Sequence, residues 1–218
     1  MKSKQREQLI KISINFAIAS LLMASASLAS AQTFQILCSF AGYGGTSWKS
    51  ALALGPDGNF YGTTGSGGTN GFGTVFRVMP NGVLTSLFSF NGTNGANPEA
   101  SLAFGSDGNF YGTTYNGGTT WQGGNSGNGT VFRLTTNGVL TTLVSFTGTN
   151  GANPGGSLTL GNDGSFYGTT SQGGITNSSY GSYYGPNGMG TIFRMTTNGT
   201  LTSLFLFNCR SNGYYRVR

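Results

Sequence analysis

Three aspartates that recur at one place in a repeat are the residues of this sequence best suited to chemistry. Asp57, Asp107 and Asp163 each stand directly before a glycine. A calcium site needs six to eight oxygen ligands, and glycoside hydrolysis needs two carboxylates at a set separation across one sugar. One aspartate per turn supplies neither arrangement, so we interpret all three as turn residues. No metal site and no cofactor is predicted.

Histidine does not occur anywhere in the 218 residues. Its absence excludes a Ser-His-Asp or Cys-His nucleophile, an imidazole base and histidine-ligated zinc. We therefore assign no catalytic residue and expect a protein that is not an enzyme.

Three arginines also recur once per repeat, near the end of a predicted strand: Arg77, Arg133 and Arg194. The turn that follows each arginine should lie on the same side of the sheet as the aspartate turns. This placement allows a structural Arg–Asp pair, and the alternative is a solvated arginine on the strand.

Aromatic side chains in the variable loops form the candidate binding site. Trp121 lies in one loop, and Tyr180, Tyr183 and Tyr184 lie in another, among Asn, Ser, Gln and Gly. Exposed aromatic rings beside amide and hydroxyl groups suit stacking on sugar rings, and they suit contact with another protein equally well. Loops without any function are the alternative. The lack of charge favours a neutral ligand such as a polysaccharide over an anionic polymer.

The elements that must position these residues are visible as an internal repeat. The block 59–64 returns at 109–114 and 165–170, the block 73–77 at 129–133 and 190–194, and the block 81–87 at 137–143 and 198–204. Three copies in the same order establish a repeat of about 50 to 60 residues. A single loop in each unit, 65–72, 115–128 or 171–189, absorbs the differences in spacing.

Each unit predicts four short strands, which in the second unit cover 101–104, 109–114, 130–134 and 139–146. Asp107-Gly108 and Asn137-Gly138 are strong hairpin signals, because both positions of such a turn tolerate positive φ. Aromatic residues such as Tyr61 and Phe76 alternate within the strands, which predicts packing between units rather than a binding stripe. The variable loops should lie on one face with the links between units, and the tight turns on the other.

The predicted fold class is all-β, a β-propeller-like repeat of four-stranded antiparallel blades. Three full units, at about 49–90, 99–146 and 155–207, follow one N-terminal strand at 34–40. A closed propeller usually has four to eight blades, so we expect an incomplete or open one. An open arc, a stacked β-solenoid and closure through another copy of the chain are the alternatives, and unpaired faces predict self-association.

Three recurring motifs, Tyr-Gly-Thr-Thr, Gly-Gly and Gly-Thr-Val-Phe, support a family resemblance over roughly residues 34–207. The chain resembles the Gloeo/Verruco (GloVer) tandem-repeat family, whose members include extracellular repeat proteins of the choice-of-anchor type. The resemblance implies an extracellular or surface-sorted bacterial protein with a propeller-like fold and no activity to transfer. The residues of its main motif are Tyr61, Gly62, Thr63, Thr64, Tyr111, Gly112, Thr113, Thr114, Tyr167, Gly168, Thr169 and Thr170.

The N-terminus has the pattern of a secretory signal peptide over residues 1–31. Basic residues extend to Lys11, a charge-free apolar stretch follows at 12–28, and 29–31 reads Ala-Ser-Ala, which suits cleavage. An uncleaved membrane anchor is the alternative; after cleavage no membrane association is expected. The repeat domain would then cover 32–207, with a non-repeat tail at 208–218. Export would allow Cys38 and Cys209 to pair only if the ends meet, and free thiols are the alternative.

Charge is concentrated at the two ends of the chain. Of 11 basic residues, four lie within the first eleven positions and three lie at 210–218. The remaining four basic residues face four acidic ones, so the body of the protein is neutral. A nucleic-acid partner is therefore excluded, because phosphate binding needs a basic face.

These features predict a secreted or cell-surface repeat protein that acts as a non-catalytic binding or structural module. Its partner would be a polysaccharide or another surface protein. The alternative is a fragment of an extracellular carbohydrate-active enzyme whose catalytic part is missing.

Overall fold

The computed structural model describes residue 36 and residues 50–174 and 188–207. The chain divides into two units, 1–36 and 37–218, and every strand described below belongs to the second. The predicted signal peptide, the strand at 34–40, both cysteines and the tail at 208–218 lie outside the described residues.

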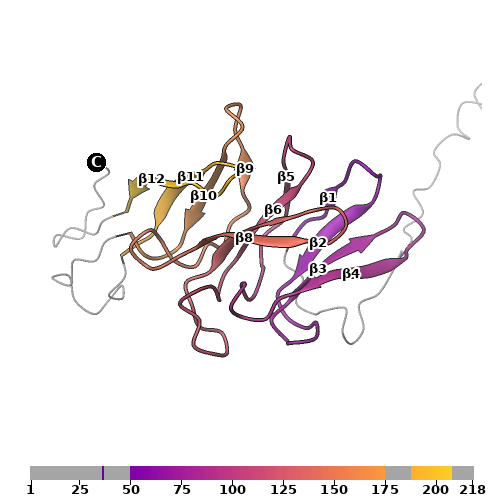
Figure 1. The fold of residues 1–218 in the computed structure, drawn as a ribbon, viewed down its shortest axis with the longest axis horizontal. Coiled ribbons are helices and arrows are strands. Elements are labelled where there is room, and N and C mark those ends of the chain that lie inside the picture. The colour runs from indigo at the N-terminus through magenta and orange to yellow at the C-terminus, as the bar shows by residue number, and fades with distance from the viewer. Residues whose placement is uncertain (1–35, 37–49, 175–187, 208–218) are drawn as a thin grey trace, which may run out of the picture. The chain divides into compact units, whose positions relative to one another are not determined.

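The described residues form three antiparallel sheets of four strands each, in chain order within every sheet (Figure 1). The first contains β1 (Ala53–Leu54), β2 (Phe60–Thr64), β3 (Thr74–Val78) and β4 (Leu84–Ser89); the second contains β5 (Ala103–Phe104), β6 (Phe110–Thr114), β7 (Thr130–Leu134) and β8 (Leu140–Ser145); the third contains β9 (Thr159–Leu160), β10 (Phe166–Thr170), β11 (Thr191–Met195) and β12 (Leu201–Leu206). The predicted all-β, propeller-like repeat of three four-stranded units is confirmed.

The predicted tight turns are present, and glycine takes the strained position in them. In the turn at 105–108, Gly108 N–H donates to the Gly105 carbonyl at 3.1 Å, and Gly105 N–H donates to the Asn109 carbonyl at 2.8 Å. Gly108 has φ of 79°, whereas Asp107 is not among the described residues with positive φ. Of the two turn residues that tolerate positive φ, only the glycine thus adopts it. A four-residue turn needs only its last position in the left-handed region, and glycine occupies it.

The fourth strand of every sheet carries one extra residue at the same place. In β8, Val144 pairs with Val131 and Thr142 pairs with Phe132, so Leu143 has no partner across the strand. The same shift leaves Leu87 unpaired in β4 and Leu204 in β12. A β-bulge of this kind bends the strand locally.

The bulges of the first two sheets each contact the next sheet, at the turn between its third and fourth strands. A Cβ built on Gly138 would lie 3.0 Å from the Leu87 carbonyl oxygen, and one on Gly199 would lie 3.0 Å from the Leu143 carbonyl oxygen. Both glycines have positive φ, 92° and 91°. The Asn-Gly turns therefore serve two purposes, since they reverse the chain and let the preceding sheet approach closely.

The Tyr-Gly-Thr-Thr motif ties each sheet to the next one. Tyr61 stacks on Phe110 of the second sheet, with ring centroids 4.3 Å apart, and Tyr111 stacks on Phe166 of the third at 4.1 Å. Thr63 Oγ1 donates to the Ala100 carbonyl at 3.1 Å. The motif is thus an inter-sheet contact, and ring pairs of this kind contribute about 0.5–1.5 kcal/mol beyond area burial.

The glycine of the motif makes room within its own sheet. Gly62 pairs with Phe76, and a Cβ on Gly62 would lie 2.5 Å from the Phe76 Cζ atom. The phenylalanine ring therefore lies flat across the glycine, as glycine without a side chain allows. Gly112 with Phe132 and Gly168 with Phe193 repeat the arrangement.

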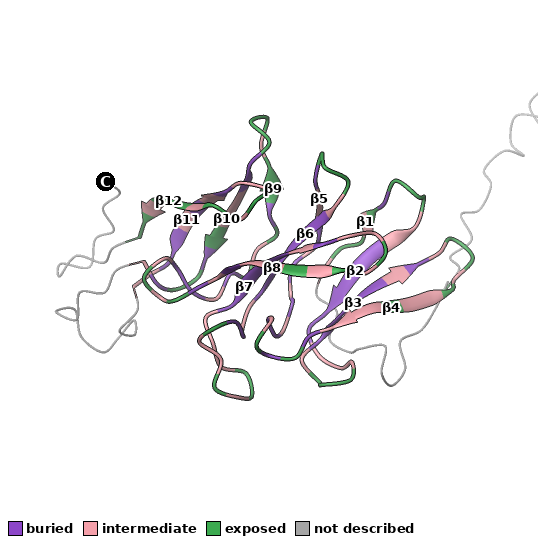
Figure 2. Ribbon diagram, viewed as in Figure 1, coloured by how far each residue is buried: buried purple, intermediate pink, exposed green. Residues whose placement is uncertain are grey.

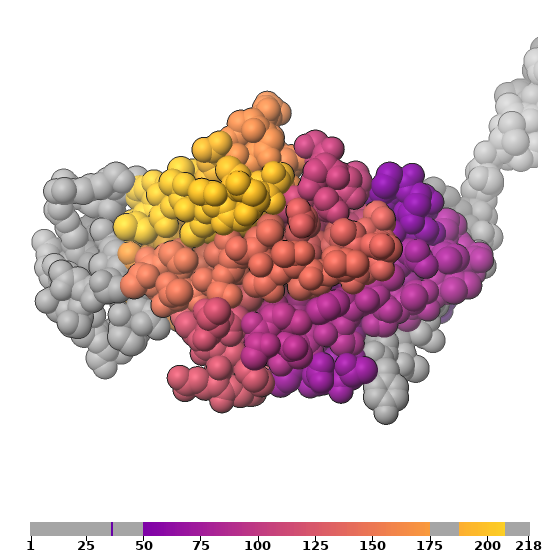
Figure 3. Space-filling view, viewed as in Figure 1, coloured from indigo at the N-terminus to yellow at the C-terminus, as the bar shows by residue number. Residues whose placement is uncertain are grey.

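The hydrophobic core lies between successive sheets. One cluster joins the first and second sheets; its buried members are Tyr61, Val75, Phe90, Leu102, Phe110, Phe132 and Leu134. The other cluster joins the second and third sheets; its buried members are Tyr111, Val131, Val144, Phe146, Leu158, Phe166, Phe193 and Met195. The predicted packing of strand aromatics between units is confirmed. In the space-filling view the units follow one another in chain order (Figure 3).

Burial is greatest in the middle sheet. All five residues of β6 are buried, whereas only the two end residues of β10 are (Figure 2). The middle sheet packs on both sides, and the third sheet exposes the side that faces away from the second.

Candidate functional site

Two faces of the repeat carry the residues that the sequence singled out. The strand registers put the β2–β3 loop at one end of its sheet and the two tight turns at the other. We call the end with residues 65–73, 115–129 and the links 91–98 and 147–154 the loop face. The end with turns 55–58, 105–108 and 161–164 is the turn face, which projects upward in Figure 1.

On the loop face, the link from the first unit passes between the loops of the first two units. Asn97 N–H donates to the Phe72 carbonyl at 2.9 Å, and Ala96 N–H donates to the Asn116 carbonyl at 2.9 Å. Gly118 N–H donates to the Gly92 carbonyl at 2.9 Å. The loops are therefore held by backbone hydrogen bonds to a common link.

The Gly-Gly motif is explained by this crossing. A Cβ on Gly117 would lie 2.5 Å from the Gly92 carbonyl oxygen and 2.6 Å from the Ala96 nitrogen. Gly173 stands in the same relation to Gly148, also at 2.5 Å. Only glycine lets the loop and the link come this close.

Trp121 is half-buried and stands at the junction of two loops. Its Nε1–H donates to the Gly124 carbonyl at 3.0 Å, within its own loop. A Cβ on Gly92 would lie 2.3 Å from the Trp121 Cε2 atom, so the indole lies against the backbone of the link. Phe72 of the first unit meets the indole edge-to-face, with ring centroids 5.5 Å apart.

Phe72 is the residue of this group that the sequence reasoning did not select. It is half-buried, and it is the aromatic residue of the shortest variable loop, 65–72. That loop offered the same signal as Trp121, an aromatic ring among glycine, serine and asparagine. Tyr180, Tyr183 and Tyr184 lie outside the described residues.

Asparagine side chains connect the links to the loops on the loop face. Asn97 Nδ2–H donates to the Gly65 carbonyl at 2.8 Å, and Asn116 Nδ2–H donates to Asn97 Oδ1 at 3.0 Å. Asn153, at the equivalent place in the next link, donates from Nδ2 to the Tyr115 carbonyl at 3.0 Å. Asn97 and Asn153 have φ of 54° and 55°, a conformation that asparagine tolerates better than most residues. Exposed polar side chains nearby include Gln122 and Asn125.

On the turn face, each aspartate is engaged within its own unit. Asp57 Oδ2 accepts from Asn59 Nδ2 at 2.6 Å and from the Tyr61 hydroxyl at 2.9 Å. Asp107 Oδ2 accepts from the Tyr111 hydroxyl at 2.7 Å. The interpretation of the aspartates as turn residues fits these contacts, and the contacts also connect each turn to an inter-sheet tyrosine.

These hydrogen bonds set the ionisation of the turn face. Burial acts to raise the pKa of Asp57 and Asp107, but donation from the neighbouring asparagine and tyrosine outweighs it and leaves each pKa below its ordinary value. The Ser165 backbone N–H lowers the pKa of Asp163. Burial, and then the hydrogen bond to the aspartate, raises the pKa of Tyr61 and of Tyr111.

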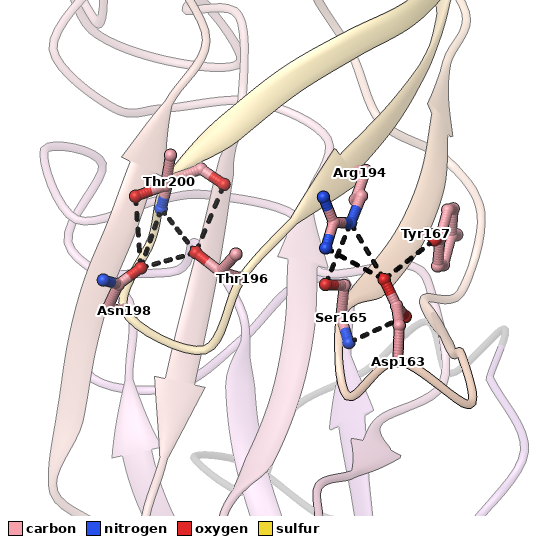
Figure 4. Close-up of polar contacts among 7 residues, drawn as sticks. All are labelled: Asp163, Ser165, Tyr167, Arg194, Thr196, Asn198 and Thr200. Carbon is pink, nitrogen blue, oxygen red and sulfur yellow. Dashed lines mark hydrogen bonds and ion pairs between the residues drawn. The ribbon is translucent and has the colours of Figure 1, made fainter.

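The predicted Arg–Asp pair is present in the third unit (Figure 4). Arg194 Nη2 lies 2.9 Å from Asp163 Oδ2, and its Nε–H donates to Asp163 Oδ2 and to Ser165 Oγ, each at 3.0 Å. Figure 4 also shows the neighbouring turn, where Thr200 N–H donates to Thr196 Oγ1 at 3.1 Å.

In the first two units, as far as the described residues extend, no such ion pair forms. Asn59 and Asn109 stand where the third unit has Ser165, and their carboxamides donate to the aspartates instead. The buried Arg77 Nε has no hydrogen-bond partner. The shorter serine leaves room for the guanidinium, so one residue difference decides the partner of the aspartate.

The described residues contain no group of three His, Cys, Asp or Glu side chains placed to hold a metal ion. In the same part of the chain, no helix is long and apolar enough to cross a membrane.

The successive four-stranded sheets and their repeated inter-sheet contacts define a β-propeller-like repeat protein. The chain belongs to the Gloeobacter/Verrucomicrobia repeat family, whose model matches residues 26–218. The family resemblance noted in the sequence is thereby confirmed.

Comparison with curated proteins finds no match. Among solved structures, the chain is similar to a structural-genomics target provisionally called a gluconolactonase, with 14% identity, a TM-score of 0.42 and coverage of 77% of this chain and 47% of that one. It is also similar to a gluconolactonase from Xanthomonas campestris, with 15% identity, a TM-score of 0.49 and coverage of 75% and 49%. The chain thus spans about half the length of these structures.

Proposed function

We propose that the protein is a non-catalytic binding module that holds a neutral polysaccharide on its loop face. The observation that carries the proposal is the contact between Trp121 and Phe72, which brings aromatic rings from the variable loops of two units together at 5.5 Å. Variable loops on a constant scaffold are where function is usually located.

The chemistry around these rings suits a sugar. Aromatic rings stack on the apolar faces of sugar rings, and amide and hydroxyl groups hydrogen-bond to the sugar hydroxyls. Gln122 and Asn125 are exposed beside Trp121, and no charged residue occurs between 100 and 106 or between 108 and 132. A neutral ligand would therefore meet no uncompensated charge here.

The carboxylates of the turn face support a non-catalytic role. A general acid at neutral pH needs a raised pKa, so the lowered pKa of Asp57, Asp107 and Asp163 makes these three carboxyls unsuited to that one role. Each aspartate accepts a hydrogen bond from a tyrosine of its own unit. Structural contacts of this kind leave the aspartates little freedom to act on a substrate.

Export is part of the proposal and rests on the sequence of residues 1–31. N-terminal sequencing of exported material should find Gln32 as the first residue. Retention of residues 1–31 would refute this part alone and leave the binding site untouched.

Pull-down on a panel of insoluble polysaccharides tests the binding site. The variants are Trp121→Ala, Phe72→Ala and the combination of Trp121→Ala with Tyr183→Ala and Tyr184→Ala. Removing one stacking residue should lower retention about tenfold, because stacking and burial of one ring contribute on the order of 1–2 kcal/mol.

Val139→Ala is the matched control. Val139 is an exposed apolar residue in a tight turn between β7 and β8, at the opposite end of the sheet from the loop face. The control should bind like the wild type. Retention that survives the triple variant, or that falls equally in the control, would rule out the loop face as the site.

A further inference from the structure

Two surfaces of the repeat carry the two halves of a contact that the structure makes twice internally. We call one side of the first sheet the leading face. It corresponds to the side by which the second and third sheets pack on the sheet before them, and it includes Leu52, Leu54, Phe60 and Gly82. The opposite side of the third sheet is the trailing face, with Tyr167, Thr169, Leu204 and Phe207.

The leading face is exposed where its counterparts are covered. Leu52 is 53% exposed, whereas the equivalent Leu102 and Leu158, which pack against a preceding sheet, are 6% and 5% exposed. Leu54 is also exposed, at 62%. The position of Leu52, which the repeat buries twice, is therefore open to solvent in the first sheet.

The trailing face shows the complementary change. Thr63 and Thr113 are each 1% exposed and donate to the carbonyl oxygens of Ala100 and Gly156 in the next sheet. The equivalent Thr169 is exposed. Tyr167 and the bulge residue Leu204 are likewise more exposed than their counterparts in the first two sheets.

We propose that these two faces bind each other between copies of the chain, in the register of the internal junctions. Tyr167 of one copy stacks on Phe60 of the other, as Tyr61 stacks on Phe110 and Tyr111 on Phe166. Thr169 donates to the Ser50 carbonyl, which is equivalent to that of Ala100. The Leu204 bulge packs beside Gly82, as the Leu87 bulge does beside Gly138.

Two copies satisfy this pairing completely. A face that binds a different face is a heterologous contact, which leaves no free surface only when a ring closes. The described residues of two copies supply six sheets, which lies within the four to eight blades of closed propellers, whereas those of three copies would supply nine. The proposed assembly is therefore a head-to-tail dimer with two equal junctions.

One internal contact has no counterpart at the junction between copies. Ala51 N–H donates to Ser101 Oγ at 2.8 Å, and Ser101 N–H donates to Ser157 Oγ at 3.0 Å. The next position in this series, in the following copy, is Ala51, which has no hydroxyl. Ala51→Ser should therefore add the missing bond and tighten the dimer about fivefold or more.

Sedimentation equilibrium of the exported chain tests the assembly. The wild type should have the mass of two chains. Leu204→Glu on the trailing face and Leu52→Glu on the leading face should each raise the dissociation constant at least about a hundredfold, because each places an unpaired carboxylate in both junctions. Val139→Glu, a change at an equally exposed apolar residue of the middle sheet, should stay dimeric.

Mixing the two monomeric variants separates head-to-tail pairing from any other. A mixed dimer of Leu204→Glu with Leu52→Glu has one junction without either change, so mixing should restore two-chain mass. A monomeric wild type, a ladder of larger assemblies, or a dimer that Leu52→Glu leaves intact would each overturn the proposal. Circular dichroism on every variant verifies that the sheets are folded.

Discussion

The hydroxyls of Tyr61 and Tyr111 each connect a turn to an inter-sheet contact. The Tyr111 ring stacks on Phe166 while its hydroxyl donates to Asp107, so one side chain holds the second sheet against the third and closes the turn at 105–108. The aspartate thereby acts on the sheet junction through the tyrosine, although it lies on the exposed end of the sheet.

This connection predicts a loss of stability at alkaline pH. The folded state raises the pKa of Tyr61 and Tyr111, so the unfolded chain loses these protons first as the pH rises. The stabilisation is fully present below about pH 10 and falls as the pH rises further. Tyr111→Phe should lower the free energy of unfolding by about 1 kcal/mol at neutral pH. It should also reduce the loss of stability at alkaline pH. Urea unfolding between pH 7 and 11 measures both.

Val139→Ala is the control for this prediction, since it changes an exposed residue of a tight turn and removes no ionisable group. It should leave the alkaline loss as in the wild type. An alkaline profile that is the same in Tyr111→Phe and in the wild type would show that the hydroxyl contributes no pH dependence.

At the scale of elements, close backbone crossings explain the two glycine motifs. Gly62 lies under the Phe76 ring within a sheet, and Gly117 lies under the link from the preceding unit. The first glycine shapes one sheet, and the second sets the approach of two units.

A pair of glycine substitutions separates backbone strain from the crossing of units. Gly117 and Gly108 have φ of 85° and 79°, so alanine is strained at both. Alanine at Gly108 meets nothing within 4 Å, whereas alanine at Gly117 meets the Gly92 carbonyl oxygen at 2.5 Å. We expect Gly108→Ala to lower the free energy of unfolding by about 1 kcal/mol, and Gly117→Ala to lower it by about 2 kcal/mol more than that.

Thermal unfolding of the two variants measures this difference. A difference of 2 kcal/mol corresponds to about 4–8 °C for a chain of this size. Equal melting temperatures would mean that the loop and the link do not cross as described.

The elements that could be predicted from the sequence are those that short segments determine. The range 130–134 matches β7 at both ends, because glycine and Asn-Gly punctuation bound it. The bulge at Leu143 could not be predicted, because it depends on how two strands pair.

The half-buried state of Trp121 depends on Gly92, 29 positions earlier, so the loop alone suggested a fully exposed ring. The choice between Arg194–Asp163 pairing and a solvated arginine depended on Ser165, a difference visible in the sequence but not interpretable without the geometry.

At the scale of the whole molecule, stability should vary from sheet to sheet. Nearest-neighbour contacts dominate in repeat proteins, and the second sheet has a neighbour on both sides. Its β6 is buried throughout, whereas β10 of the third sheet has a half-buried and exposed centre.

Hydrogen exchange on a dilute, monomeric sample should reveal this order. Amides of β6 and β7 should exchange most slowly, and those of β10 and β11 should open at lower free energy. Uniform protection across all three sheets would instead indicate one cooperative unit in which the sheet faces contribute equally.

The central claim is that the turn face is structural and the loop face binds. The most direct test is the binding isotherm of Asp107→Asn on the polysaccharide that retains the wild type, recorded below its melting temperature beside Trp121→Ala. We predict that Asp107→Asn binds with wild-type affinity although it melts about 2–4 °C lower, from a loss of about 1 kcal/mol, and that Trp121→Ala binds about tenfold more weakly. Loss of binding in Asp107→Asn with an unchanged melting temperature would contradict the claim and would place the site among the carboxylates.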